Sequence, residues 1–272
     1  MTDRRFFRAN GRIGHDSLQG QVTDRPLTAG TTLRIRIPVA DLCASPGGKR
    51  DKQLLFGQAF TLLEERHGWA FGFDPADGYV GYLRADTLHE APEPTHRITA
   101  RSSHIYTLDD IKSPDRLPLS CFSEIPVAEE SDCFAELVTG GFIPSQHIAP
   151  LDWQAEDPVA VAEGFLGTPY LWGGNSTLGI DCSGLVQLAF HAAGRACPRD
   201  SDLQAGSWDD AEGAPQRGDL VFWKGHVAMM LSETDMIHAN AHHMAVAIEP
   251  FATARDRIAQ KEFGEILRIA RP

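Results

Sequence analysis

The chain has 272 residues, of which 42% are hydrophobic and 23% charged, and its formal net charge is −12. This composition is typical of a globular protein rather than a disordered one. A strongly acidic chain lacks the basic face that nucleic-acid binding needs, so we expect no nucleic-acid partner. The length allows one large domain or two to three small ones.

The cysteines and the N-terminus bear on the compartment. The five cysteines are scattered and form no CxxC pair, so the sequence predicts neither a disulfide framework nor a zinc site. Arg4-Arg5 resembles a twin-arginine start, but the residues after Phe7 lack the apolar run of an export signal. There is also no run of about 18 apolar residues that could span a membrane. We therefore expect a cytoplasmic protein with no membrane segment, no metal and no other cofactor.

The first half of the chain reads as two small β-rich blocks. Residues 1–29 are polar, and we expect a poorly ordered or loosely docked lead-in. Short alternating stretches separated by turn signals then predict an antiparallel barrel over residues 30–91. Prolines at 92 and 94 predict a linker, and a second block of similar size covers residues 95–152. Both blocks end in a glycine-aromatic turn, Gly78-Tyr79-Val80 and Gly141-Phe142-Ile143, which indicates a degenerate repeat of one barrel type.

Residues 153–272 have a different pattern. Asp157-Pro158 is an N-cap followed by proline at the first helical position, so it predicts a helix start. A second apolar helical pattern begins near Cys182 and stops at Gly194. Strands are predicted after it at residues 219–223, 226–231, 236–239, 245–248 and 266–269. A helix carrying a cysteine against an antiparallel sheet carrying histidines indicates an α+β fold.

The stretch from Thr168 to Val186 predicts a reactive thiol. Its glycine pairs and aromatic residues lead into Cys182 at the start of a helix, where unpaired N–H groups and the helix dipole stabilise a thiolate. A nucleophilic thiolate also needs an imidazole to take its proton and a third polar group to orient the ring. Cys182, His226 and His238 can supply these three parts.

These motifs resemble the NlpC family of papain-like cysteine peptidases. The resemblance covers residues 158–272 and rests on four segments. The first half, with two SH3-like barrels, resembles the subgroup that cuts free cell-wall peptides during recycling. The implied architecture is a papain-like α+β domain preceded by two SH3-like β-barrels. The segments are Tyr170–Val186, Arg217–Trp223, Gly225–Ala228 and Met236–Ala239.

The resemblance implies an activity and a catalytic set. Cys182 would be the nucleophile, His226 the base and His238 the residue that orients the base. Tyr170 would place its hydroxyl in the oxyanion hole. The family hydrolyses the bond between γ-D-glutamate and the diamino acid of peptidoglycan stem peptides. The recycling subgroup releases L-Ala-γ-D-Glu and requires a free N-terminal L-Ala.

The resemblance also implies substrate-binding residues. Asp181 would hold the substrate ammonium by charge-assisted hydrogen bonds, and Ser183 and Ser201 would line the substrate groove. In related enzymes the first barrel places a tyrosine and an acidic residue over the groove. Tyr79 is the candidate tyrosine, whereas Gln58 stands where the acidic residue is expected. Glutamine lacks the charge, so this departure bears on how strictly a free amine is required.

The residues leave several alternatives open. With a three-residue turn at 233–235, simple antiparallel register places His226 opposite His242 rather than His238, so Asn240 and His242 compete for the third position. Asp181 could simply cap the following helix, and Tyr79 could be a packing residue. A noncatalytic fragment-binding protein, or a thiol hydrolase acting on another amide or ester, remains an alternative function. The preferred diamino acid, the substrate length and the oligomeric state are not predicted.

Overall fold

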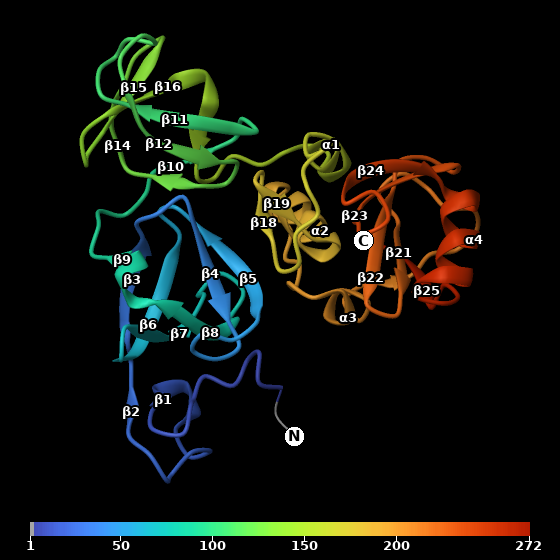
Figure 1. Cartoon of the computed structure of the whole chain (residues 1–272), viewed down its shortest axis with the longest axis horizontal. Helices are drawn as coiled ribbons and strands as arrows, with labels where there is room; N and C mark the ends of the chain where they lie inside the picture. The colour runs from blue at the N-terminus through green and yellow to red at the C-terminus, as the bar shows by residue number, and fades with distance from the viewer. Residues whose placement is uncertain (1–2) are drawn as a thin grey trace. The chain divides into compact units, whose positions relative to one another are not determined.

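A computed structural model describes residues 3–272 of the chain (Figure 1). The chain divides into two compact units, of which the first ends at Leu151 and the second is Asp152–Pro272. The first unit is built from β-strands with short 3-10 turns, and the second combines helices with a large antiparallel sheet. The predicted α+β class is confirmed.

Barrel 1, the name used here for the strands between Thr31 and His89, is a seven-stranded sheet in the order β5-β4-β8-β7-β6-β3-β9, with antiparallel neighbours. Its core consists of side chains that point inward from alternate strand positions, among them Ile35, Leu54, Phe60 and Leu83. Its elements are β3 (Thr31–Ile35), β4 (Val39–Cys43), β5 (Arg50–Leu55), β6 (Ala59–Arg66), β7 (Trp69–Phe73), β8 (Val80–Arg84), η2 (Ala85–Thr87) and β9 (Leu88–His89).

The lead-in is attached to barrel 1 by side-chain and main-chain hydrogen bonds. Arg12 Nε lies 2.7 Å from Glu64 Oε1, and Arg4 pairs with Asp51 at 2.9 Å. The Val80 N–H donates to the Arg5 carbonyl over 2.7 Å. The prediction of a poorly ordered or loosely docked lead-in is therefore wrong for residues 3–29, while residues 1–2 lie outside the described part. Its elements are β1 (Gly14–His15), η1 (Asp16–Leu18) and β2 (Leu27–Thr28).

Barrel 2, the name used here for the strands between His96 and Pro150, contains a five-stranded and a three-stranded sheet around a core that includes Ile98, Ile125 and Ile143. It ends as barrel 1 does, with a strand, a 3-10 turn and a short strand, so the two blocks share their closing structure. Its elements are β10 (His96–Ile98), β11 (Ser102–Tyr106), β12 (Asp115–Ser120), β13 (Glu124–Ile125), β14 (Val127–Glu130), β15 (Phe134–Leu137), β16 (Phe142–Pro144), η3 (Ser145–His147) and β17 (Ile148–Pro150).

The second unit is organised around a six-stranded antiparallel sheet in the order β20-β25-β21-β22-β23-β24. Helix α2 packs on β22 and β23, and α4 packs on the other face through Ala254 and Ile258 (Figure 1). The elements are α1 (Pro158–Glu163), β18 (Asn175–Ser176), β19 (Gly179–Ile180), α2 (Cys182–Ala192), α3 (Ser201–Gln204), β20 (Asp209–Asp210), β21 (Leu220–Trp223), β22 (His226–Met230), β23 (Asp235–Asn240), β24 (Ala245–Pro250), α4 (Phe251–Lys261) and β25 (Arg268–Arg271).

Helices α2 and α4 differ in how strongly their sequences specify them. In α2 almost every residue is buried, and the helix ends where Gly194 takes a φ of 69°. In α4 only Ala254 and Ile258 are buried, one turn apart, in a helix with four charged residues among its 11. The sequence therefore predicts α2 but gives no clear apolar pattern for α4. No helix within residues 3–272 is long and apolar enough to cross a membrane.

Candidate active site

Cys182 is the first residue of α2, and the loop before it is shaped by glycines. Asp181 is the N-cap, and its carboxylate accepts the Gly184 N–H over 2.8 Å. A Cβ on Gly184 would lie 2.6 Å from the Gly174 carbonyl oxygen, so only glycine allows the loop to approach the helix this closely. The Cys182 side chain is consequently held at the start of a buried helix, with 7% of the residue exposed.

His226 and His238 come from neighbouring strands and are joined directly. His226 begins β22, His238 lies within β23, and Nε2 of the first is 2.8 Å from Nδ1 of the second. Both residues are buried. The strands pair Met230 with Met236, whereas the predicted register places Met230 opposite His238, so the prediction is wrong by two residues along β23. The observed register makes the two histidines diagonal neighbours on one face, which is within reach of two imidazole rings.

The two competing candidates for the third position lie elsewhere. The Asn240 amide contacts the His238 carbonyl at 3.4 Å, and its oxygen accepts the His243 N–H over 2.8 Å. His242 is exposed and its ring contacts that of His243. Of the three candidates that the sequence left open, His238 is the one whose side chain is hydrogen-bonded to His226.

The Cys182 sulfur lies next to β22, the strand that begins with His226. It accepts a hydrogen bond from the Val227 N–H of this strand. Burial raises the pKa of the Cys182 thiol to about 12; the charge of Asp181 acts in the same direction, and the Val227 N–H and Arg199 act against it. Burial also lowers the pKa of His226 well below 6.5. Neither group is therefore charged by itself near neutral pH, and a thiolate forms only when its proton passes to the imidazole.

Sequence reasoning missed Glu249, which continues the histidine pair. Glu249 lies on β24, and its Oε1 is 2.8 Å from Nε2 of His238. The same oxygen is 2.6 Å from Nη2 of Arg257 on α4. His238 pairs with Ala247 across the two strands, so a residue two positions further along is its diagonal neighbour. The only signal in the sequence is a single carboxylate at the end of the predicted strand at residues 245–248.

Tyr170 is half-buried in the loop before α2. Its N–H donates to the Met244 carbonyl over 2.9 Å, which anchors the residue to the loop before β24. Burial raises the pKa of the Tyr170 hydroxyl, and the nearby Cys182 and Asp181 raise it further. The hydroxyl is therefore protonated and able to donate a hydrogen bond near Cys182, as an oxyanion-hole residue must. Its catalytic role stays a prediction.

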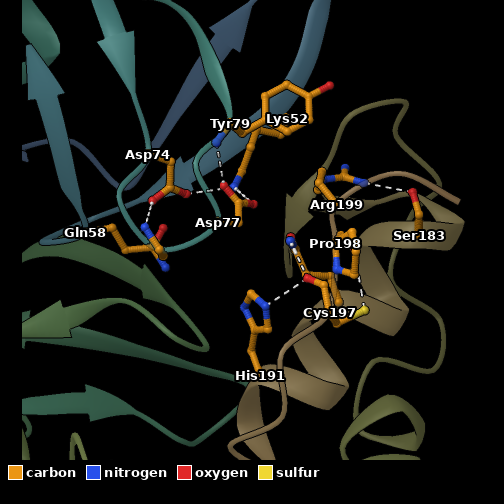
Figure 2. Close-up of polar contacts among 12 residues, drawn as sticks. Lys52, Gln58, Asp74, Asp77, Tyr79, Ser183, His191, Cys197, Pro198 and Arg199 are labelled. Carbon is orange, nitrogen blue, oxygen red and sulfur yellow. Dashed lines mark hydrogen bonds and ion pairs between the residues drawn. The ribbon is translucent and has the colours of Figure 1, made fainter. Parts of the chain in front are cut away.

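Asp181 forms a buried ion pair that the sequence did not predict. Arg199 donates from Nη1 to Oδ1 over 2.8 Å and from Nη2 to Oδ2 over 2.9 Å. Arg199 Nη1 also contacts the Ser183 hydroxyl at 2.9 Å (Figure 2). The Gly173 N–H donates to Oδ2 over 2.8 Å, in addition to the Gly184 cap. Most of the accepting positions of the carboxylate are thus already used within the protein.

The loop that carries Arg199 is itself anchored to α2. His191 contacts the Cys197 carbonyl at 3.0 Å (Figure 2). The Gln187 side-chain amide donates to the same carbonyl over 3.1 Å. Ser201, the remaining predicted groove residue, begins α3 and is partly exposed. The structure therefore brings Tyr170, Cys182, Asp181 and Ser183 together at one helix start. The predicted substrate-binding roles of Asp181, Ser183 and Ser201 stay predictions.

The two candidates from the first unit lie in barrel 1. The Tyr79 ring belongs to the barrel core, makes an edge contact with Phe6 and lies 5.9 Å from the ammonium of Lys52. Lys52 pairs with Asp74 at 2.7 Å and Asp77 at 2.6 Å (Figure 2). Gln58 accepts the Leu55 N–H over 2.9 Å and reaches the Phe122 carbonyl of barrel 2 at 3.4 Å. Their roles toward a substrate stay predictions.

The adjacent histidines His242 and His243 are arranged ring edge to ring face. Imidazole is a common metal ligand, but a protein site for a metal ion such as zinc usually has three or four ligands. Within residues 3–272 no group of three or more His, Cys, Asp or Glu side chains is placed to hold a metal ion.

A cysteine at the start of a helix, packed against an antiparallel sheet with a hydrogen-bonded histidine pair, defines a papain-like thiol hydrolase. Comparison with known proteins gives the same class. The profile of the NlpC/P60 family matches residues 167–264, and that of the bacterial dipeptidyl-peptidase Sh3 domain matches residues 42–88.

Individual relatives extend the similarity over both units. Dipeptidyl-peptidase 6 of Lysinibacillus sphaericus is 36% identical over 223 residues, which cover 69% of this chain and 79% of that protein. The gamma-D-glutamyl-L-lysine dipeptidyl-peptidase of Bacillus subtilis (strain 168) is 29% identical over 79% of this chain and 80% of its own. A crystal structure of an NlpC/P60 family protein from Bacillus cereus ATCC 10987 has the same fold, with a TM-score of 0.74, 21% identity, and coverage of 89% of this chain and 99% of that one.

The chain belongs to the NlpC/P60 family. It is a cysteine peptidase that acts on peptidoglycan peptides and carries an N-terminal SH3 domain.

Proposed function

We propose that this peptidase hydrolyses the bond between γ-D-glutamate and the diamino acid of peptidoglycan stem peptides, and releases L-Ala-γ-D-Glu. The observation that carries the proposal is the buried Cys182 at the start of α2, beside the strand on which His226 is joined to His238. The substrate is inferred from the dipeptidyl-peptidase relatives, whose similarity extends beyond the catalytic unit.

In the proposed reaction the Cys182 proton passes to Nδ1 of His226 as the sulfur attacks the γ-carbonyl carbon of D-glutamate. Tyr170 and the Cys182 N–H would stabilise the oxyanion of the tetrahedral intermediate. Its collapse breaks the C–N bond, and His226 returns the proton to the leaving amine of the diamino acid. Water, activated by the same imidazole, then cleaves the thioester and releases the dipeptide.

We place recognition of the substrate N-terminus at Asp181, with Ser183 and Ser201 beside it. The buried pairing of Asp181 with Arg199 means that a substrate ammonium would share a carboxylate that already accepts several N–H groups. Such a site favours a charged substrate amine over an uncharged one only if the ammonium binds Asp181 while Arg199 stays paired with it. Tyr79 and Gln58 of barrel 1 stay candidates for substrate-binding residues.

A peptide series tests this substrate assignment. We expect L-Ala-γ-D-Glu-L-Lys and its diaminopimelate analogue to give L-Ala-γ-D-Glu, detected by mass spectrometry. N-acetylation of the alanine should lower kcat/KM at least about tenfold, since loss of a charge-assisted hydrogen bond costs about 1.5–3 kcal/mol. Equal cutting of free and acetylated peptides would contradict amine recognition, and no cutting of either would contradict the substrate class.

The cytoplasmic location expected from the sequence is part of the same proposal, because free stem peptides are the substrates of a recycling enzyme. Fractionation of the producing cells with an antibody against this chain tests it. Recovery in the culture medium or the envelope fraction would contradict it.

A further inference from the structure

The histidine pair does not end at His238. A continuous row of contacts runs from His226 through His238 and Glu249 to Arg257, with separations of 2.8, 2.8 and 2.6 Å. The two histidines and Glu249 are 3%, 1% and 8% exposed. These hydrogen bonds are therefore shielded from water, and in such surroundings the proton position in one bond strongly affects the proton position in the next.

The contacts fix where each proton lies. A carboxylate accepts hydrogen bonds only, so the His238 nitrogen that faces Glu249, Nε2, must carry a proton. In a neutral ring the other nitrogen, Nδ1, is then an acceptor, and His226 must donate to it from Nε2. His226 consequently has its lone pair on Nδ1, the nitrogen that is left to take a proton from the thiol.

This reasoning needs Glu249 to be ionised and the histidines to be neutral. Burial alone would raise the pKa of Glu249, but the hydrogen bond from His238 and the charge of Arg257 hold it at about 2. Burial lowers the pKa of His238, although its hydrogen bond to Glu249 opposes the change. His243 also faces Glu249, at 3.6 Å, and Glu262 contacts the other side of Arg257.

We propose that Glu249, held in place and ionised by Arg257, is a positioning residue that sets the proton arrangement of His238 and, through it, of His226. The inference rests on the proposed catalytic roles of Cys182, His226 and His238. Without the carboxylate, His238 can take the opposite tautomer and donate from Nδ1, which forces His226 to accept at Nε2 and to carry its own proton on Nδ1. In that arrangement the base cannot accept the Cys182 proton.

Helix α4 gains a functional role from this proposal. It contributes Arg257, and Phe263, two residues after its end, stacks on the His226 ring with an interplanar angle of 15° and a centroid distance of 5.1 Å. The C-terminal segment would thus hold the base by two separate contacts, one through charge and one through ring packing.

The first test replaces the carboxylate by its uncharged isostere, Glu249→Gln. We expect kcat to fall roughly 10- to 1,000-fold, with KM changed less than about twofold, because the base and not the binding site is disturbed. The matched control is Asp219→Asn. Asp219 is a buried carboxylate directly before β21 of the same sheet, 1% exposed, and is paired with Arg271 of β25 at 2.8 Å. This control should lose thermal stability and keep kcat within about twofold.

The second test reads the tautomers without turnover. In ¹⁵N-histidine-labelled enzyme, the ring resonances should report N–H at Nε2 of both His226 and His238. Arg257→Leu should lower kcat, and Arg257→Lys, which restores the charge, should recover part of the loss. These measurements test the proposal even if the Glu249→Gln variant does not fold.

Three results would overturn the proposal: a proton on Nδ1 of either ring in the wild type, unchanged kcat in folded Glu249→Gln, or an equal loss of kcat in Asp219→Asn. Full turnover by Cys182→Ala would instead contradict the proposed function. The two failures are therefore distinguishable.

Discussion

At the scale of single residues, the site depends on two groups that are each uncharged when taken alone. Burial disfavours both the Cys182 thiolate and the His226 imidazolium. Their opposite charges stabilise each other only when both are present, so the pair holds one proton and titrates as a unit. The macroscopic pKa values of such a pair lie further apart than those of the isolated groups.

The pH dependence of turnover follows from this separation. We expect kcat to be constant from about pH 6.5 to 9.0, the ordinary pKa values of histidine and cysteine. As the pH falls below the lowered pKa of His226, the base is protonated and activity is lost. As the pH rises toward the raised pKa of Cys182, the Cys182–His226 pair loses the proton that it shares, and kcat falls again.

The measurement is kcat rather than kcat/KM, because kcat reports the bound complex and excludes titration of the free substrate amine, whose pKa is about 8. A titration with its midpoint between pH 6.5 and 9.0 would contradict the shared-proton description.

At the scale of elements, the starts of helices α1 and α2 differ in how deeply their N-cap residues and ion pairs are buried. The N-cap of α2, Asp181, pairs with Arg199, whose side chain is fully buried. The N-cap of α1, Asp157, pairs with Arg217 at 2.7 Å, and both of these side chains are about two-fifths exposed. An exposed pair contributes little to stability, whereas removing one partner of a buried pair leaves an uncompensated charge.

Replacing each arginine by methionine compares the two starts. Arg199→Met should lower the free energy of unfolding of the catalytic unit by about 3–5 kcal/mol. Arg217→Met should lower it by about 0–1 kcal/mol. Urea unfolding followed by tryptophan fluorescence measures both. Similar losses in the two variants would show that the Asp181–Arg199 pair does not hold the start of α2.

The elements that the sequence predicts well are those with a local signal. The start of α2 follows from an N-cap, a glycine and an apolar run, so neighbouring residues in the chain are enough to place Cys182 at a helix start. The β22–β23 register has no such signal, because the turn lies one residue earlier than predicted. The Leu231 N–H donates to the Asp235 carbonyl, and the Ser232 hydroxyl accepts the N–H groups of Thr234 and Asp235. Glu249 was missed for the same reason, since its role depends on the pairing of two strands.

At the scale of the whole molecule, the two units differ in how much of the chemistry they contain. The catalytic unit contains the thiol, the histidine pair and the Arg199 ion pair, so its chemistry follows from its own contacts. Barrel 1 contains Tyr79 in its core beside the buried Lys52 cluster. Sequence motifs singled out Cys182, His226 and His238, and the structure joins the two histidines by a hydrogen bond. They did not locate Arg199 and Glu249, which contact Asp181 and His238 from other elements of the same unit.

The central claim is that Cys182 performs the reaction on the γ-D-glutamyl bond. It is tested most directly by incubating L-Ala-γ-D-Glu-L-Lys with the wild type and with Cys182→Ala, and measuring L-Ala-γ-D-Glu by mass spectrometry. Circular dichroism and the thermal transition show whether the variant keeps its fold. We predict rapid release of the dipeptide by the wild type and none above background by the folded variant. Release by Cys182→Ala at the wild-type rate would contradict the claim.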